Sequence, residues 1–243
     1  MLAVAGLPEV EAGDGLGAML AAAADPGEGD VLVVSQKVVS KAEGRVVPLA
    51  EVEPGDRARE LAAEHAKDPR VVELVLRESR RIVRAERGVL IAETNGGWVC
   101  ANAGVDASNV AATDAVALLP EDADASARRL RAEIEAVAGT RPAVVVADSF
   151  GRPWRLGQAD VAIGCAGLVV LDDWRGRTDR DGRELEATEV AVADQAAAAA
   201  DLVRDKDAGL PAALVRGLDR FVTAEDGPGA TAIQRPAPED LFR

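Results

Sequence analysis

The chain has 243 residues, of which 48% are hydrophobic but only 2% aromatic, and its formal net charge is −14. This length allows one large domain or two small ones, with a core built from Ala, Val, Leu and Ile. The acidic balance argues against nucleic acid as a partner, because affinity for a phosphate backbone rests on Lys and Arg. We find neither an export signal nor an apolar run of the roughly 20 residues that span a bilayer, and we expect a cytoplasmic protein.

The first half of the chain predicts strands, a loop and one amphipathic helix. Residues 31–34 form a β-branched run followed by polar residues, which predicts a buried strand that feeds a loop over residues 35–44. Apolar side chains recur on one helical face over residues 69–84, so we predict an amphipathic helix there. Residues 89–93 and 98–102 flank an Asn-Gly pair, which indicates a tight β-hairpin.

The second half predicts two helices and two strands. A helix is expected over residues 126–138, with Gly139 placed to end it. Residues 144–146 predict a strand that opens onto a polar tip. A further helix is expected over residues 189–203, and a last strand over residues 212–216.

The order of these elements favours a mixed α+β fold over a regular doubly wound sheet, because helices and strands alternate irregularly and include a hairpin. We assign residues 1–226 to the main domain. Residues 227–243 contain several prolines and are interpreted as a tail, a linker or surface strap rather than core.

Two aspartates emerge from apolar segments into turns. Asp106 lies in the run Ala-Gly-Val-Asp-Ala-Ser-Asn, and Asp148 in the run Ala-Asp-Ser-Phe-Gly-Arg. Carboxylates in such places suit a hard cation such as Mg²⁺ or Mn²⁺, and two of them could share one ion. The alternative is that each carboxylate caps a helix or a turn.

Lys41 and Arg152 are the candidate cations for an anionic ligand. Lys41 lies beyond the first strand, where it would either face a phosphate or lie on the surface as a solvated lysine. Arg152, Trp154 and Arg155 follow Asp148 closely, and two guanidinium groups beside an indole suit an anionic ligand that carries a ring. The alternative is an arginine paired with a nearby carboxylate beside a packed tryptophan.

Several other chemistries are disfavoured. His65 is the only histidine and belongs to what resembles a solvated helix face, which argues against a His-rich zinc site and a Ser-His-Asp triad. Neither a Walker loop nor a Gly-x-Gly-x-x-Gly fingerprint is present, so a nucleotide would be held in another way. Cys100 and Cys165 lie in apolar, strand-like segments, and we expect inert buried thiols rather than a disulfide or metal pair.

Ordered blocks along the chain resemble the coenzyme F-420:L-glutamate ligase family. The blocks are residues 38–47 (Val-Val-Ser-Lys-Ala-Glu-Gly-Arg-Val-Val), 67–74 (Lys-Asp-Pro-Arg-Val-Val-Glu-Leu), 100–109 (Cys-Ala-Asn-Ala-Gly-Val-Asp-Ala-Ser-Asn), 148–155 (Asp-Ser-Phe-Gly-Arg-Pro-Trp-Arg) and 160–164 (Asp-Val-Ala-Ile-Gly). The resemblance covers nearly the whole chain. Blocks of this length in this order are more specific than a single short motif, and they favour the metal interpretation of Asp106 and Asp148.

The resemblance implies a GTP-dependent ligase. It implies that GTP phosphorylates the carboxylate on the lactyl-phosphate arm of coenzyme F-420-0, and that the amine of L-glutamate attacks the acyl phosphate to form an amide. Further γ-linked glutamates are added in later rounds. Such chemistry needs cations around the phosphates more than a covalent protein nucleophile. The implied cofactors are a divalent cation, Mg²⁺ or Mn²⁺, with GTP as co-substrate and K⁺ as a further candidate.

The resemblance also implies site residues. Asp106 and Asp148 resemble the ligands of one divalent cation, and Ser149 stands where the family usually has a Thr that contacts a second metal ion. The implied contacts of the nucleotide are Leu7, Pro8, Glu9, Val10, Gln36, Lys41, Asn109 and Lys206.

Two of these positions depart from the usual pattern of the family. Gln36 stands where a hydroxyl residue is more usual. Lys206 lies in a predicted loop, residues 204–211, where some relatives offer an amide to a metal, and an ammonium cannot ligate one. Lys41 and Arg152 are the cations that we expect to act in catalysis.

The fold that the resemblance implies is the two-lobed α+β fold of the F-420 gamma-glutamyl ligase type, assembled as an intertwined homodimer with the active site near the groove between subunits. Residues 235–243 resemble the junction at which two-domain actinobacterial relatives continue into a flavin-binding reductase domain. Both a single-domain ligase and a piece cut at this boundary stay open.

Two other functions stay open beside this ligase. One is an amide ligase for another phosphorylated carboxylic acid. The other is a non-catalytic module that binds the deazaflavin and hands it to a separate reductase. The second is disfavoured, because a binding module has no need of Asp106, Asp148 and Lys41 together.

Overall fold

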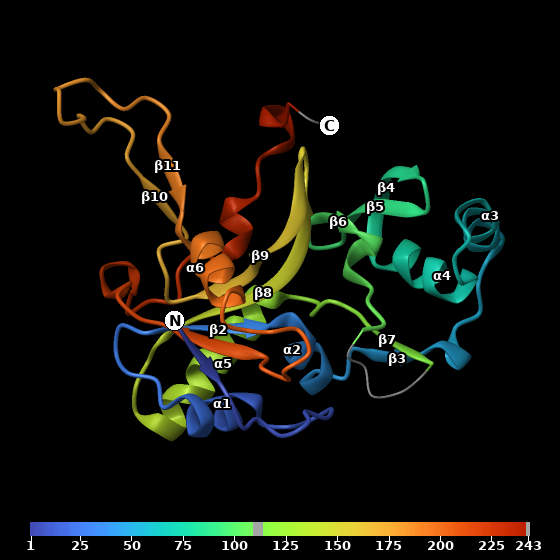
Figure 1. Ribbon diagram of the computed structural model, residues 1–243, viewed down its shortest axis with the longest axis horizontal. Coiled ribbons are helices and arrows are strands. Elements are labelled where there is room, and N and C mark those ends of the chain that lie inside the picture. Colours follow the sequence, from blue (N-terminus) through green and yellow to red (C-terminus); the bar gives the residue numbers. More distant parts are fainter. Residues whose placement is uncertain (109–113, 242–243) are drawn as a thin grey trace.

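A five-stranded sheet forms the centre of the computed structural model, which describes residues 1–108 and 114–241 (Figure 1). Its strands, in spatial order, are β1 (Leu2–Val4), β12 (Ala212–Val215), β2 (Val31–Ser35), β8 (Ala143–Arg152) and β9 (Arg155–Ala166). β2 and β8 run parallel, and the other neighbours in the sheet are antiparallel. The carboxyl ends of β2 and β8 therefore lie at the same edge, with Ser35 opposite Ala147.

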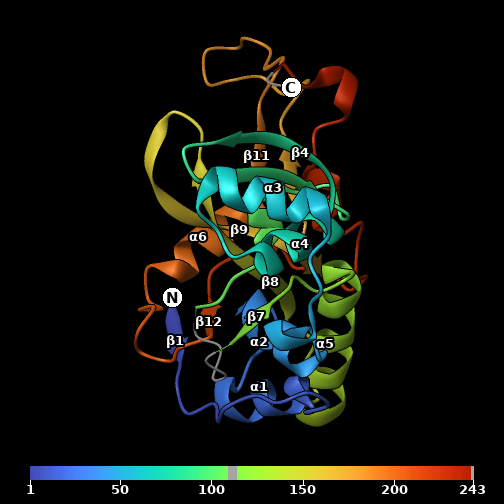
Figure 2. The same cartoon turned by 90° about the vertical axis from the view of Figure 1, so that its right-hand side faces the viewer.

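Helices cover both faces of this sheet. α1 (Leu16–Ala24) and α5 (Ala123–Ala138) pack on one face, and α6 (Val192–Asp201) packs on the other (Figures 1 and 2). Residues 31–34 supply both cores, because Leu32 and Val34 face α1 and α5 while Val31 and Val33 face α6. A strand buried on both faces needs no polar alternation, which explains the unbroken apolar run in the sequence.

A smaller α+β unit is formed by residues 46–108 and 114–118 and has its own hydrophobic core. Its elements are β3 (Val46–Pro48), α3 (Asp56–His65), α4 (Pro69–Arg77), β4 (Ser79–Glu86), β5 (Val89–Thr94), β6 (Val99–Ala101) and β7 (Ala115–Ala117). β4, β5 and β6 form an antiparallel sheet, and β3 pairs with β7. The two helices lie on the side of this unit that faces the viewer in Figure 2.

The remaining elements are short. α2 (Gln36–Ala42) follows β2, and β10 (Leu171–Asp173) pairs with β11 (Glu189–Ala191) at the base of a protruding arm (Figure 1). Single 3₁₀ turns occur at Leu49–Glu51, Asn102–Gly104, Asp219–Phe221, Ala230–Ile233 and Ala237–Glu239. Within residues 1–108 and 114–241, no helix combines the length and the apolar character needed to cross a membrane.

The structure confirms the mixed α+β class and much of the predicted order of elements. β5 and β6 form the expected hairpin around the Asn-Gly pair. α5 ends at Gly139, whose φ of 69° places it in the left-handed conformation that glycine adopts without strain. The last predicted strand is present as β12.

Residues 35–44 do not form the expected loop. α2 begins directly after β2, and the hydroxyl of Ser35 caps it by accepting a hydrogen bond from the amide of Lys37 (3.4 Å). The polar composition of residues 35–44 suggested a loop, but the segment contains a short amphipathic helix that buries Gln36, Val39 and Ser40. Because Lys37 and Lys41 are four residues apart on this helix, they project from the same face.

The helix predicted over residues 69–84 is also too long. α4 ends at Arg77, where the hydroxyl of Ser79 donates a hydrogen bond to the carbonyl of Val75 (2.6 Å). Residues 79–86 instead form β4, which pairs with β5 across two irregularities in register. The apolar spacing of this segment fitted a helix, but antiparallel pairing with β5, which follows after only two residues, decided its conformation. Likewise, α6 begins only at Val192, because residues 189–191 form β11.

Three residues expected to be bystanders lie inside the protein. Cys100 and Cys165 are free, buried thiols on strands, as predicted. Burial, together with the nearby carboxylates of Asp148 and Asp124 respectively, raises the pKa of each thiol to about 12. His65 lies on a helix, but the expectation of a solvated position was wrong, because its side chain is buried against the core of the smaller unit.

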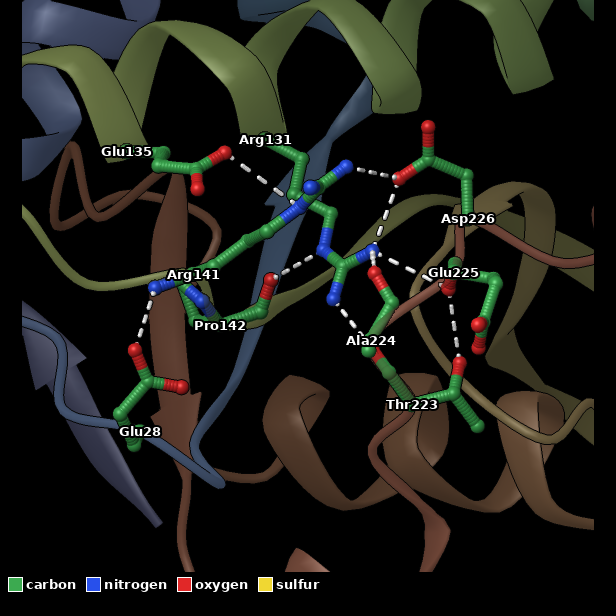
Figure 3. A network of polar contacts seen from close by, with 9 residues as sticks. All are labelled: Glu28, Arg131, Glu135, Arg141, Pro142, Thr223, Ala224, Glu225 and Asp226. Atoms are coloured by element: carbon green, nitrogen blue, oxygen red, sulfur yellow. Dashed lines mark hydrogen bonds and ion pairs between the residues drawn. The ribbon is translucent and has the colours of Figure 1, made fainter.

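Arg131 on α5 holds the chain that follows β12 (Figure 3). Its side chain is 1% exposed and forms an ion pair with Asp226 (2.8 Å). The same guanidinium donates hydrogen bonds to the carbonyls of Pro142 (3.0 Å), Ala224 (3.2 Å) and Glu225 (3.1 Å). A single buried cation therefore joins α5, the chain before β8 and the chain after β12.

The segment after residue 226 also packs on the main body. Ala230 is fully buried, and the carboxylate of Asp124 accepts hydrogen bonds from the amides of Ala230 (2.6 Å) and Thr231 (3.2 Å). This part of the chain belongs to the core on the α6 side of the sheet. The division of the chain at residue 226 stays a prediction.

Candidate active-site cavity

A cavity of about 860 Å³ lies at the carboxyl end of β2, beside Asp148 and Ser149 of β8. Its walls come from segments that are far apart in sequence, within residues 7–10, 35–41, 101–108, 148–160 and 201–211. The carboxyl ends of parallel strands are a common place for ligands in α/β sheets, because the chain diverges there to either side. The polar side chains around this cavity decide what it can bind.

Asp106 is held in the cavity wall by its backbone and by a lysine. Its amide and carbonyl exchange hydrogen bonds with Ala117 of β7 (3.1 and 2.9 Å). The ammonium of Lys37 lies 2.7 Å from Oδ2 of Asp106 and also donates to the carbonyl of Ser108 (2.7 Å). Burial opposes ionisation of Asp106, but hydrogen bonds from Lys37 and Ser108 outweigh it and hold the pKa of the carboxyl below its usual value.

Asp148 lies in the opposite electrostatic setting. β8 runs on to Arg152, so this carboxylate projects from within a strand and not from the polar tip that the sequence predicted. Burial raises its pKa to about 6, and the negative charges of Asp160 and Asp106 act in the same direction. Among the residues that the structure describes, no Lys or Arg forms an ion pair with it. The carboxylate is therefore short of positive charge.

Ser149 is the centre of a polar chain beside Asp148. Its hydroxyl donates a hydrogen bond to Oδ1 of Asp160 (2.6 Å), the residue opposite it on β9. The other oxygen of Asp160 forms an ion pair with Arg204, and both side chains are almost fully buried. The ammonium of Lys206 donates to the hydroxyl oxygen of Ser149 (2.6 Å). This chain joins β8, β9 and the segment after α6.

The predicted nucleotide contacts near the N-terminus meet α2. Lys41 forms an ion pair with Glu9, which places residues 7–10 against the same helix face as Lys37. Gln36 is buried, and its Oε1 accepts a hydrogen bond from the hydroxyl of Ser40 (2.9 Å). One side of the cavity thus carries the ammonium groups of Lys37 and Lys41.

The turn at Asn102–Gly104 is conformationally unusual. Asn102, Ala103 and Gly104 all have positive φ, of 52°, 52° and 74°. Oδ1 of Asn102 is buried and has no hydrogen-bond partner among the residues that the structure describes, and Asn102 lines the cavity. Strained backbone of this kind costs free energy and gathers at functional sites. A Cβ at Gly104 would lie 2.5 Å from Cγ of Leu119, so only glycine fits there.

The cavity fits a hard divalent cation. Within the described part of the chain, no three His, Cys, Asp or Glu side chains come close enough to hold a metal by themselves. Mg²⁺, however, is usually bound by one or two carboxylates together with phosphate oxygens and water. Asp106 and Asp148 supply two carboxylates, one of them short of positive charge, and Oδ1 of Asn102 is a neutral oxygen without a partner. Oxygen donors of this kind suit Mg²⁺ or Mn²⁺.

The cavity collects most of the residues singled out from the sequence. They are Leu7, Pro8, Glu9, Val10, Gln36, Lys41, Asp106, Asp148, Ser149 and Lys206. Asn109 lies outside the described residues. Arg152 does not line the cavity: it lies on the exposed β8–β9 hairpin and donates to the carbonyl of Leu156 (2.7 Å). The binding and catalytic roles of all these residues stay predictions.

The polar side chains of the cavity that were not predicted as site residues include Lys37, Asn102, Asp160 and Arg204. Lys37 could have been found from its spacing to Lys41, once the segment was read as a helix instead of a loop. Asn102 and Asp160 lay inside the blocks already singled out, without a feature that set them apart. Arg204 gave no signal, because its importance comes from a partner on β9.

Comparisons with known proteins agree with one another. The family model for F420-0:Gamma-glutamyl ligase matches residues 6–217. A protein of Methanopyrus kandleri called coenzyme F420:L-glutamate ligase is 47% identical over 237 residues, which are 97% of this chain and 94% of the relative. Proteins with the same name from Methanothermobacter thermautotrophicus and Haloarcula marismortui are 41% and 43% identical over 250 residues, covering 100% of this chain and 98% and 95% of theirs.

Proposed function

The chain belongs to the F420-0:gamma-glutamyl ligase family, and from that premise we propose that it joins L-glutamate to coenzyme F420-0 with GTP and a divalent cation. The relatives that match almost its whole length carry the name of this ligase. The observation that supports the finer proposal most directly is that Asp106 and Asp148 line one cavity together with Lys37 and Lys41. Carboxylates for a cation and ammonium groups for phosphates are the groups that GTP needs.

The proposed reaction has two steps. In the first, a carboxylate oxygen of the lactyl-phosphate arm attacks the γ-phosphorus of GTP, the bond from that phosphorus to the bridging oxygen breaks, and GDP leaves. In the second, the amine of L-glutamate attacks the carbon of the acyl phosphate, inorganic phosphate leaves, and the amine loses a proton. Phosphorylation is needed because a carboxylate oxygen is otherwise a poor leaving group. Repetition on the γ-carboxylate adds further glutamates.

The side chains of the cavity suit distinct parts of this reaction. Lys41 and residues 7–10, which meet in the ion pair of Lys41 with Glu9, would bind the nucleotide, and Lys37 favours the ionised form of Asp106. Asp106 and Asp148 would hold the divalent cation, with Asn102 able to offer a further oxygen. When bound, that cation neutralises charge on the transferring phosphoryl group. We also propose that the chain forms the intertwined homodimer of its family. Light scattering on the purified protein would measure the oligomeric state.

A mass measurement tests the proposal. The chain is incubated with coenzyme F420-0, GTP, Mg²⁺ or Mn²⁺ and L-glutamate, and the coenzyme is analysed by mass spectrometry. We expect a mass gain of one glutamyl unit, with GDP formed in equal amount. If no nucleoside triphosphate supports a mass gain, the proposal is wrong. If other phosphorylated carboxylic acids compete strongly with the coenzyme, the acceptor has to be reassigned.

A further inference from the structure

The hydroxyl of Ser149 has a defined direction in this structure. Oδ1 of Asp160 lies 2.6 Å away and can only accept, because Arg204 forms an ion pair with the other oxygen of that carboxylate. The hydroxyl proton therefore points to Asp160. The lone pairs of Ser149 are left for a cation on the side of the cavity.

The ammonium group of Lys206 occupies this position beside the hydroxyl oxygen of Ser149. The ammonium of Lys206 lies 2.6 Å from the hydroxyl oxygen of Ser149, and an ammonium can only donate. Asp205 and Asp207 flank this lysine, but within the described residues Lys206 forms an ion pair with neither of them. The side chain thus points to the cavity although acidic neighbours are at hand.

The segment that carries Lys206 is fixed at both ends. Arg204 forms its ion pair with Asp160 and also donates to the carbonyl of Pro211 (3.2 Å), and the same carbonyl accepts from the amide of Ser35 (2.7 Å). One buried arginine therefore closes residues 204–211 into a loop and attaches it to β9. The loop is anchored to the same carboxylate that orients Ser149.

We propose that the ammonium of Lys206 stands in for a second divalent cation at Ser149. The site then holds one divalent cation, at Asp106 and Asp148, and one cation that belongs to the protein. A divalent ion bound to Ser149 would have to lie in contact with the ammonium, and two cations at that distance repel each other strongly. This inference rests on the proposed function, because it assigns the two cations to a site for a nucleoside triphosphate.

The number of bound metal ions tests the inference. The protein is dialysed to equilibrium against Mn²⁺, with the same concentration of a GTP analogue carrying a β,γ-imido bridge on both sides of the membrane. The ratio of Mn²⁺ to protein is then measured by atomic absorption. We expect one Mn²⁺ per chain for the unchanged protein and for Lys206→Arg, which keeps the charge. We expect two for Lys206→Gln, because the amide removes the charge and offers an oxygen.

A matched control and the activity assay separate the alternatives. Lys67→Gln removes a lysine that does not line the cavity and should leave the ratio at one. The inference is overturned if the unchanged protein binds two Mn²⁺ or none, or if Lys206→Gln still binds one. Glutamylation of the coenzyme is read separately by mass, so an active protein with the wrong metal ratio overturns only this inference. A protein without ligase activity overturns the proposed function.

Discussion

The ammonium of Lys37 lies 2.7 Å from Oδ2 of Asp106, and this contact joins the first turn of α2 to the segment after β6. The ammonium also bonds to Ser108, so one side chain organises the part of the wall from which Asp106 projects. Lys37 thereby favours the charged form of Asp106, which is the form that the proposed cation would require.

Replacement of Lys37 should weaken metal-dependent activity. In Lys37→Gln the hydrogen bond and the positive charge that lower the pKa of Asp106 are lost or weakened, and we expect roughly a 10- to 100-fold loss of apparent affinity for Mn²⁺. Titration of the ligase rate with Mn²⁺ measures this. Lys67→Gln serves as the control, and an apparent affinity of Lys37→Gln within about twofold of that control would show that the contact is dispensable.

Asp148 should be needed for ligase activity but should lower the free energy of unfolding at neutral pH. Its folded-state pKa, about 6, lies above the ordinary value of 3.8. The native carboxyl therefore binds a proton that the unfolded chain has already released, and stability falls as pH rises through this interval. We expect Asp148→Asn to be inactive but more stable than the unchanged protein by between about 1 and 3 kcal/mol at pH 7.5.

The pH dependence of that difference is the sharper measurement. Urea unfolding in the presence of EDTA should show nearly all of the advantage of Asp148→Asn above pH 6 and little of it near pH 4, because that pH is close to the unfolded pKa of 3.8 and the cost of protonation differs little between the two states there. A difference in stability that does not change with pH would show that the carboxylate is not destabilised by its surroundings. Near-normal turnover would remove Asp148 from the mechanism.

Gly104 should tolerate no side chain. Gly104→Ala has to place a Cβ into Leu119 as well as adopt a left-handed backbone, and we expect a loss of about 2–5 kcal/mol in the free energy of unfolding. Gly176→Ala is the matched control, since Gly176 has a φ of 77° and open space around it. That variant should lose only about 1–2 kcal/mol. Equal losses would mean that Leu119 moves aside freely.

Arg131 should be worth more to stability than its neighbour Arg129 on the same helix. Arg131→Met leaves Asp226 and several carbonyls without their buried partner, which costs about 3–5 kcal/mol. Arg129→Met removes ion pairs of a half-exposed side chain, which cost at most about 1 kcal/mol. Chemical denaturation of the two variants compares them. A loss below about 1 kcal/mol for Arg131→Met would mean that solvent replaces its partners.

The sequence predicted the elements whose local pattern agreed with their final surroundings. Local sequence alone favours one conformation in three of them. These are the strand at residues 31–34, the hairpin around the Asn-Gly pair and the helix ended by Gly139. The segment at residues 79–86 differs, because its periodicity fits a helix, and only pairing with β5 makes it a strand. The burial of His65 was not predicted, because α3 is rich in charged residues, yet it buries one face made of Ala58, Leu61, Ala62 and His65.

The residues of the candidate site likewise divide into those that the sequence could predict and those that depend on contacts between distant segments. Asp106, Asp148 and Lys41 could be singled out from sequence and resemblance, and the structure places all three around one cavity. The contact of Lys206 with Ser149 could not be foreseen, because it depends on a loop that Arg204 ties to another strand. The left-handed backbone conformation of Asn102 could not be predicted from the sequence either, because nothing in an Asn-Ala-Gly run requires it.

The walls of the cavity come from early, middle and late segments of the chain. Ligand binding therefore depends on the folding of all of these segments. Residues 7–10 follow β1 and residues 201–211 precede β12, and β1, β12 and β2 are neighbours in one sheet. A ligand that occupies it adds its binding free energy to the stability of the entire chain. Nucleotide and metal should accordingly protect α5 and β9 from proteolysis as strongly as they protect the loops that touch them.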